Sequence, residues 1–369
     1  MELMRGSKSE SISARQVKIV GVGTATAVGI NASMTAASVR ANLSRFKTSD
    51  LIDRAGEPIV LSMVEYLHEA LRGLDRLSAL AIPAAQEAVA PLLTAGLTGK
   101  QFSPVLLCLG LATARPGFDP DRIKTALFDR LRQAVPFIDS EGVILACGHA
   151  AGLMGIGTAL RWIATGKADA MLVGGIDSYF DADTLEWLDQ NKRLHSEANK
   201  DGFVPGEAAG FCLLASAGFA QRHRLKSMAT ILSAVSGEEP QPSTSDGICI
   251  GKGLTAVLRE ALDVVPPGEK ASDWTICDLN GECFRATDWA YAYLRTGPRH
   301  RDPLEIWHPA DCYGDIGAAS GAVLTAISVA AWERGYARGN RCLIWSASDA
   351  AERSAVLAER ALSTIKAGV

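Results

Sequence analysis

The 369-residue chain lacks the features that mark several large classes of protein. Its net charge is −4 and it has no long basic run, so the footprint of a nucleic-acid-binding protein is missing. We find no uninterrupted apolar stretch long enough to cross a bilayer. The first 16 residues are polar, unlike a secretory signal. These absences predict a protein with neither nucleic-acid nor membrane partners.

The eight cysteines lack a recognisable pattern. No two of them form a C-x-x-C pair, so a metal site is not expected. Cys108 and Cys212 lie in apolar runs and are expected to be small core residues. Without an export signal, free thiols indicate the reducing cytoplasm. The first strand is not followed by G-x-G-x-x-G, and no organic cofactor is expected.

Short apolar strands alternate with helical segments along the chain. Hydrophobic residues are 48% and charged residues 21%, which is an ordinary globular balance. This alternation predicts an α/β fold with a largely parallel sheet. The clearest strands are expected at 17–24, 104–111, 168–175, 274–279 and 342–345, and the clearest helices at 76–93, 121–133 and 148–165.

A weak internal repeat divides the chain. The small-residue helix after Cys147 is followed by an apolar strand at 170–173, and a second small-residue helix from Gly317 is followed by a strand at 342–345. The spacing predicts a tail at 1–16 and two similar halves, at 17–216 and 217–369. Each half would contribute one strand-to-helix turn to a single central site.

Three segments, in order, resemble the β-ketoacyl synthases of the thiolase-like superfamily. They are Cys147-Gly-His-Ala-Ala-Gly, the strand and glycine pair of 166–177, and Asp201-Gly-Phe-Val-Pro-Gly-Glu-Ala-Ala-Gly210. The resemblance implies a thiolase-like α/β fold, in which two pseudo-repeated halves form a layered α-β-α-β-α core. It also implies a two-fold homodimer.

The second half departs from the family pattern at the places of its two histidines. Asn280-Gly-Glu282 stands at the first and Asp315 at the second. Trp345-Ser-Ala-Ser-Asp-Ala350 replaces a glycine-rich turn near the end, and Ala310 replaces a lysine. Asn280 has a parallel in thiolases, where an asparagine in a similar segment helps to form an oxyanion hole.

The resemblance makes Cys147 the nucleophile. A helix N-terminus favours a thiolate and offers amides for an oxyanion hole. Asn280 would polarise the acyl carbonyl, while Glu282 or Asp315 would handle protons. Decarboxylative condensation is expected to be poor, because losing two histidine donors costs about 6 kcal/mol, roughly 3 for each. An ionised Asp315 would also repel the thiolate and the enolate.

Other titratable residues have lesser expected roles. His149 lies two residues after Cys147, and a helix would turn it about 200° away from the site. It is therefore expected to be a packed or interface histidine. His308 is expected at the surface, although a loop would bring it within reach of the site. Structural roles are expected for Asp201, Glu207 and Asp288, and His195 has no clear role.

These features favour a divergent acyltransferase. It would form a Cys147 thioester from an acyl-carrier protein or coenzyme A donor and pass the acyl group to an acceptor that is not a carbanion. Two alternatives stay open. One is a true 3-oxoacyl synthase of fatty acid or polyketide biosynthesis with a rebuilt site, and the other is a non-catalytic partner or scaffold subunit.

Overall fold

The computed structural model describes residues 16–97, 105–245 and 247–361. Within them, ten strands are ordered β10-β9-β11-β12-β8-β1-β7-β6-β4-β5. The first wing of this sheet contains β1 (Val17–Thr26), β4 (Val105–Leu111), β5 (Ile138–Leu145), β6 (Ala170–Ser178) and β7 (Glu207–Ser216). The second wing contains β8 (Ala229–Glu238), β9 (Trp274–Cys277), β10 (Ile306–Trp307), β11 (Arg341–Ala347) and β12 (Glu352–Arg360).

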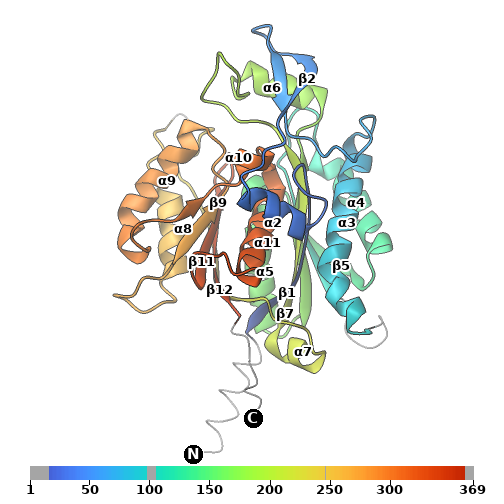
Figure 1. Cartoon of the computed structure of the whole chain (residues 1–369), viewed down its shortest axis with the longest axis vertical. Helices are drawn as coiled ribbons and strands as arrows, with labels where there is room; N and C mark the ends of the chain where they lie inside the picture. The colour runs from blue at the N-terminus through green and yellow to red at the C-terminus, as the bar shows by residue number, and fades with distance from the viewer. Residues whose placement is uncertain (1–15, 98–104, 246, 362–369) are drawn as a thin grey trace, which may run out of the picture.

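Within the described residues, β1 of the first wing pairs with β8 of the second through Lys18 with Thr230 and Ile19 with Ala229. Helices α5 (Ala151–Ala164) and α11 (Ser320–Glu333) lie between the wings and contact strands of both. The outer face of the first wing is covered by α3 (Gly73–Thr94) and α4 (Pro120–Ala134), and that of the second by α8 (Lys252–Leu262) and α9 (Cys283–Thr296). Figure 1 therefore shows five layers, and the expected thiolase-like α-β-α-β-α fold is confirmed.

The two wings share one topology. β4 pairs in parallel with β5 and β6, while β7 pairs antiparallel with β6 and β1. In the second wing, β9 pairs in parallel with β10 and β11, while β12 is antiparallel to β11 and β8. The expected largely parallel sheet is wrong in this respect, because β7 and β12 each reverse direction. The limits 17–216 and 217–369 remain a prediction, and the tail at 1–16 lies, except for Gln16, outside the described residues.

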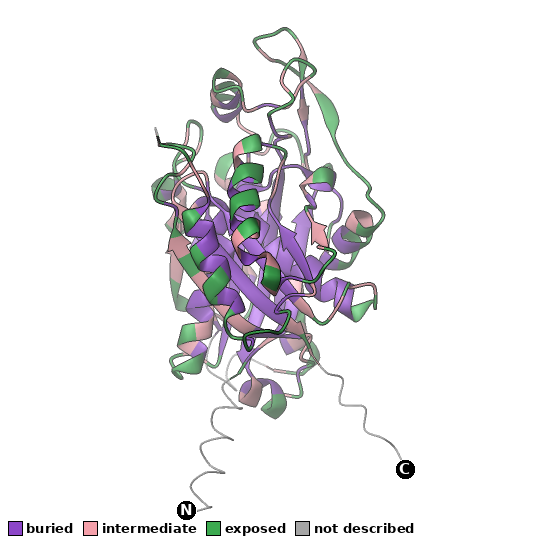
Figure 2. Cartoon of the chain, turned by 90° about the vertical axis from the view of Figure 1, so that its left-hand side faces the viewer, coloured by how far each residue is buried: buried purple, intermediate pink, exposed green. Residues whose placement is uncertain are grey.

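The central layer is the most deeply buried. Every residue of α11 from Ser320 to Trp332 is buried, as expected for a helix with a sheet on each side. Figure 2 shows buried residues through the middle of the molecule and exposed ones along the outer helices. By length and hydropathy α3 is able to span a membrane, but half of its most apolar stretch is buried and it packs against β1 and β7. We interpret it as a core helix.

The smaller elements border this core. They are α2 (Ala32–Arg40), α6 (Ala182–Gln190), α7 (Ala217–Arg222), α10 (Ala310–Tyr313) and the hairpin of β2 (Lys47–Ile52) and β3 (Pro58–Leu61).

Both central helices begin with the same turn. Cys147 has φ −116° and ψ 15°, and Ile316 has φ −115° and ψ 16°. Each is followed by a glycine of positive φ, Gly148 at 66° and Gly317 at 48°, and then by a short 3₁₀ turn. Positive φ favours glycine because other residues have a Cβ that clashes there. The chain at 147–150 is therefore not α-helical.

Candidate functional site

The two turns meet between the wings. Beside them is a cavity of about 540 Å³ whose walls come from both halves of the chain. Its lining is rich in charged and polar side chains, among them Thr113, Arg115, His149, Asp177, Tyr179, Arg193, Glu282, Ser348 and Asp349.

Asp315 is the hub of the buried residues behind this cavity. Its Oδ1 and Oδ2 lie 2.9 and 3.0 Å from His149 Nε2, and its Oδ2 accepts a 2.7 Å hydrogen bond from Asn280 Nδ2. Tyr179 donates its hydroxyl to Oδ1 at 3.2 Å, and the Gly317 amide donates at 2.8 Å. Four donors from both halves thus converge on one carboxylate.

His149 and Asp315 form a buried ion pair. The two side chains are 4% and 3% exposed. Burial acts to raise the pKa of Asp315, but the neighbouring His149 and Arg285 and the Gly317 amide hold it well below its usual range. Burial likewise acts to lower the pKa of His149, yet the Asp315 carboxylate leaves it raised overall. Asp315 is therefore ionised near neutral pH, and its carboxylate favours the charged form of the imidazole while Arg285 opposes it.

Two arginines surround the ion pair. Arg193 makes two 2.7 Å hydrogen bonds to Glu282 and a 2.6 Å bond to Asp349. Arg285 lies 2.6 Å from Asp349 Oδ1 and 3.2 Å from His149 Nε2. Burial opposes their charge, but the facing carboxylates raise the pKa of both guanidinium groups. Since both oxygens of Glu282 are occupied, it is a poor candidate for a free general base.

Cys147 is not among the residues that line the cavity. Its carbonyl accepts a 2.5 Å hydrogen bond from Ser348 Oγ. Burial and then the negative charge of Glu352 raise the pKa of the thiol, which opposes the expected stabilisation of a thiolate at the helix N-terminus. Asn280, Glu282 and Asp315 lie together, and no hydrogen bond among the described residues links them to the thiol that was expected to be the nucleophile.

The expectation that His149 faces away from the site is also wrong. A rotation of 100° per residue applies to a regular helix, which begins only at Ala151. The left-handed Gly148 and the 3₁₀ turn instead direct residue 149 to the second half of the chain. The glycine between Cys147 and His149 is the only signal of this in the sequence.

Of the remaining candidates, Asp201 also lines the cavity, and the others lie in separate contacts. Glu207 makes two 2.6 Å bonds to Arg76, and Asp288 makes a 2.9 Å bond to Arg353. Asp201 accepts a hydrogen bond from the Cys283 amide, and His308 pairs with Asp311 at 2.8 Å. His195 lies in the loop after α6, and its backbone amide donates a hydrogen bond to the Phe203 carbonyl.

Sequence reasoning missed the cavity residues Arg115, Tyr179, Arg193 and Asp349, and also Arg285 behind them. Their partners are distant along the chain, so no local pattern marks them. Asp349 is the exception, since it belongs to the segment 345–350 that departs from the family's glycine-rich turn.

A model of the β-ketoacyl synthase N-terminal domain matches residues 143–220. The chain is therefore similar to the β-ketoacyl synthases. It is 28% identical over 257 residues to Nodulation protein E of Rhizobium leguminosarum bv. trifolii. That match covers 60% of this chain, which spans only 62% of the length of that relative.

Solved structures share the fold of this β-ketoacyl-synthase-like chain over nearly its whole length. The ishigamide ketosynthase/chain length factor has a TM-score of 0.74 at 18% identity, covering 95% of this chain and 100% of its own. A type II PKS acyl-carrier protein in complex with its ketosynthase bound to the hexaketide gives 0.73 at 16%, covering 94% and 100%. The ketosynthase from module 6 of the bacillaene synthase of Bacillus subtilis 168 gives 0.76 at 12%, covering 94% and 72%. At these identities the likeness shows the fold alone.

Proposed function

We propose that this chain is a non-catalytic ketosynthase-like subunit that supports a catalytic ketosynthase in fatty acid or polyketide synthesis. The observation that carries the proposal is the pair of His149 and Asp315. In the resembling family, a thiol from the first half faces two histidines from the second. Here an imidazole faces Asn280 and Asp315.

Neither side chain of the first turn is suited to accept an acyl group. A nucleophilic imidazole needs a free lone pair, but His149 Nε2 is held against both oxygens of Asp315, whose charge raises the pKa of the imidazole. The Cys147 thiol has a raised pKa, which keeps it protonated near neutral pH. An enolate formed beside Asp315 would also meet a fixed negative charge.

The proposed partners are a catalytic ketosynthase and, through it, an acyl-carrier protein. The fold matches include a ketosynthase/chain length factor and an acyl-carrier protein in complex with its ketosynthase, which supports this choice. Strand β5 is at one end of the sheet order and only partly buried, so it offers a free edge for a second subunit. A coenzyme A donor and a homodimer stay predictions.

Thiol labelling tests the absence of an acyl intermediate. The full chain is treated with iodoacetamide or with an acyl-thioester, and adducts are mapped by mass spectrometry. We expect Cys147 to react no faster than the exposed Cys283 and to carry no acyl group. A His149→Cys variant is the positive control, because it would introduce a thiol into the cavity.

A second candidate function is acyl transfer on Cys147, which its half-buried position at the turn leaves open. Selective acylation of Cys147, abolished in Cys147→Ala, would establish it and overturn the proposal. Carbon dioxide release from a malonyl-thioester by the chain alone would instead favour a true synthase. Co-expression with a catalytic ketosynthase, followed by sedimentation, is expected to give a 1:1 complex.

A further inference from the structure

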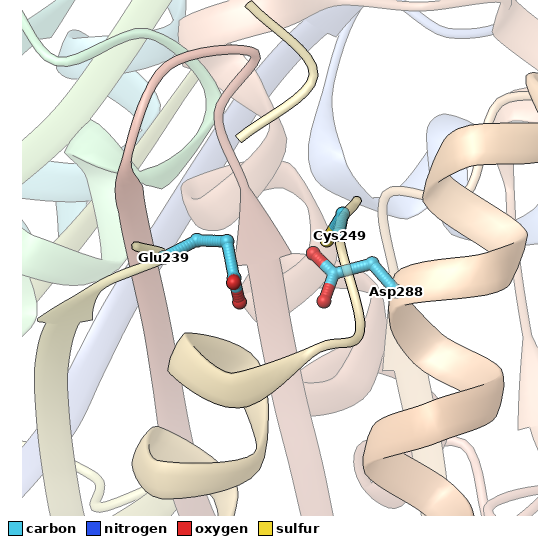
Figure 3. Close-up of side chains that lie close together, drawn as sticks. All are labelled: Glu239, Cys249 and Asp288. Atoms are coloured by element: carbon cyan, nitrogen blue, oxygen red, sulfur yellow. The ribbon is translucent and has the colours of Figure 1, made fainter. Parts of the chain in front are cut away.

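Three potential metal ligands lie together outside the cavity. Glu239 follows β8, Cys249 lies just before α8, and Asp288 is on α9. One ligand atom from each lies within 4.8 Å of the other two. Figure 3 shows the Asp288 carboxylate directed at the Cys249 thiol, with Glu239 on the opposite side.

Asp288 has an unused ligand atom. Its side chain is 2% exposed, and its Oδ2 accepts a 2.9 Å hydrogen bond from Arg353 Nε. Its Oδ1 is buried and has no hydrogen-bond partner among the described residues. Leaving a buried polar atom unpaired destabilises the fold, and does so more strongly when the group is charged. A positively charged ligand between Asp288 and Cys249 would remove this cost.

Glu239 is held in place to serve as a second ligand. It is 2% exposed, and its Oε2 accepts a 2.6 Å hydrogen bond from the Gly253 amide in the first turn of α8. Its Oε1 has only a 3.4 Å contact with the Gln241 amide. The carboxylate therefore has a fixed orientation and a weakly used oxygen.

The charges in the cluster are unbalanced. Among the described residues, Arg353 is the cation bonded to the cluster, and its Nη1 also donates to three backbone carbonyls. A bound cation would offset this excess of negative charge.

We propose that Glu239, Cys249 and Asp288 bind a zinc-type divalent cation. One thiolate and two carboxylates suit a borderline metal such as Zn²⁺, whereas Mg²⁺ and Ca²⁺ prefer oxygen ligands alone. Zinc bonds of about 2.0–2.3 Å place tetrahedral ligand atoms about 3.3–3.8 Å apart, so small side-chain movements suffice. The fourth position is left for water, and the Cys249 proton is released on binding.

This site does not depend on the proposed function of the chain. Its three ligands come from three separate segments, so the absence of C-x-x-C in the sequence did not exclude it. A bound cation would tie the end of β8 and the start of α8 to α9, and so strengthen the outer layer of the second wing.

Metal titration of the intact protein tests the site. The full-length chain is stripped with a chelator, and Zn²⁺ is titrated against a chromophoric competitor. We expect one equivalent per chain and a higher unfolding temperature with Zn²⁺. Cys249→Ser is expected to weaken binding by about tenfold or more. Cys283→Ser, which removes an exposed thiol, is the matched control and is expected to bind like the parent.

Cobalt gives a readout that does not depend on stability. Co²⁺ in the parent is expected to show a thiolate charge-transfer band that is absent in Cys249→Ser and present in Cys283→Ser. Unchanged binding in Cys249→Ser, loss of binding in Cys283→Ser, or no stoichiometric binding in the parent would each overturn the proposal.

Discussion

At the scale of single residues, the ion pair of His149 and Asp315 is the most sensitive point of the molecule. Removing one partner of a buried pair leaves the other charge uncompensated, which costs about 3–5 kcal/mol. We expect Asp315→Asn to lower the free energy of unfolding by this amount, measured by urea denaturation. The exposed Glu197, which pairs with Lys200, supplies a control in Glu197→Gln.

A double-mutant cycle separates this pair from general damage to the cavity. Asp315→Asn combined with His149→Gln is expected to cost less than the sum of the single changes, by about 0.5–3 kcal/mol. Additive costs would mean that the two residues act independently and would contradict the ion pair.

The same pair predicts a pH dependence of stability. The pKa of His149 is raised in the folded state, so its contribution is complete below the unfolded pKa of about 6.5 and is lost as pH rises through the folded pKa. Asp315 has the opposite sign, and its contribution is lost only in acid. The stability difference between the parent and His149→Gln is therefore expected to shrink above about pH 6.5. An NMR titration of the His149 imidazole with a midpoint below this value would contradict it.

Part of the site is predictable from single residues and part is not. Asn280, Glu282 and Asp315 stand where family motifs place site residues, and the structure brings them together. His149, rather than Cys147, lines the cavity because of the positive φ at Gly148, which the glycine itself permits but does not dictate. Arg193 lines the cavity and Arg285 lies behind it, and both are positioned by Asp349, which is distant along the chain.

At the scale of elements, the glycine turns before the central helices are the features most open to test. A Cβ added at Gly317 would lie 1.9 Å from Asp177 Oδ2, which is fixed by Arg115 and the Ala318 amide. Gly56 also has positive φ, but nothing lies within 4 Å of its would-be Cβ. We expect Gly56→Ala to cost about 1–2 kcal/mol and Gly317→Ala about 1–3 kcal/mol more, by urea denaturation. Equal costs would mean that the close approach to Asp177 is unimportant.

The elements themselves follow closely from the apolar pattern. The strand expected at 104–111 is β4 at Val105–Leu111, and the helix expected at 121–133 is α4 at Pro120–Ala134. The direction of each strand is harder to predict from the sequence. The all-buried β7 has the continuous apolar pattern of a parallel strand, yet it pairs antiparallel on both sides.

At the scale of the whole molecule, the layers predict how stability is distributed. α11 lies between two sheets, whereas β2 contains no buried residue. Amide hydrogen exchange is expected to be slowest in α11, α5 and β7, where opening requires unfolding of the core, and fastest in the β2–β3 hairpin. Comparable protection in α11 and β2 would contradict this picture of a layered core.

The turns before α5 and α11 have matching backbone angles but different side chains, so one is a reference for the other. His149 and Ala318 occupy the same step of two turns with nearly the same backbone angles. Ala318 therefore displays what this step looks like when it carries only a methyl group. The backbone of this turn therefore does not need an imidazole to keep its angles. We expect position 149 to accept a different reactive group without a change in the backbone.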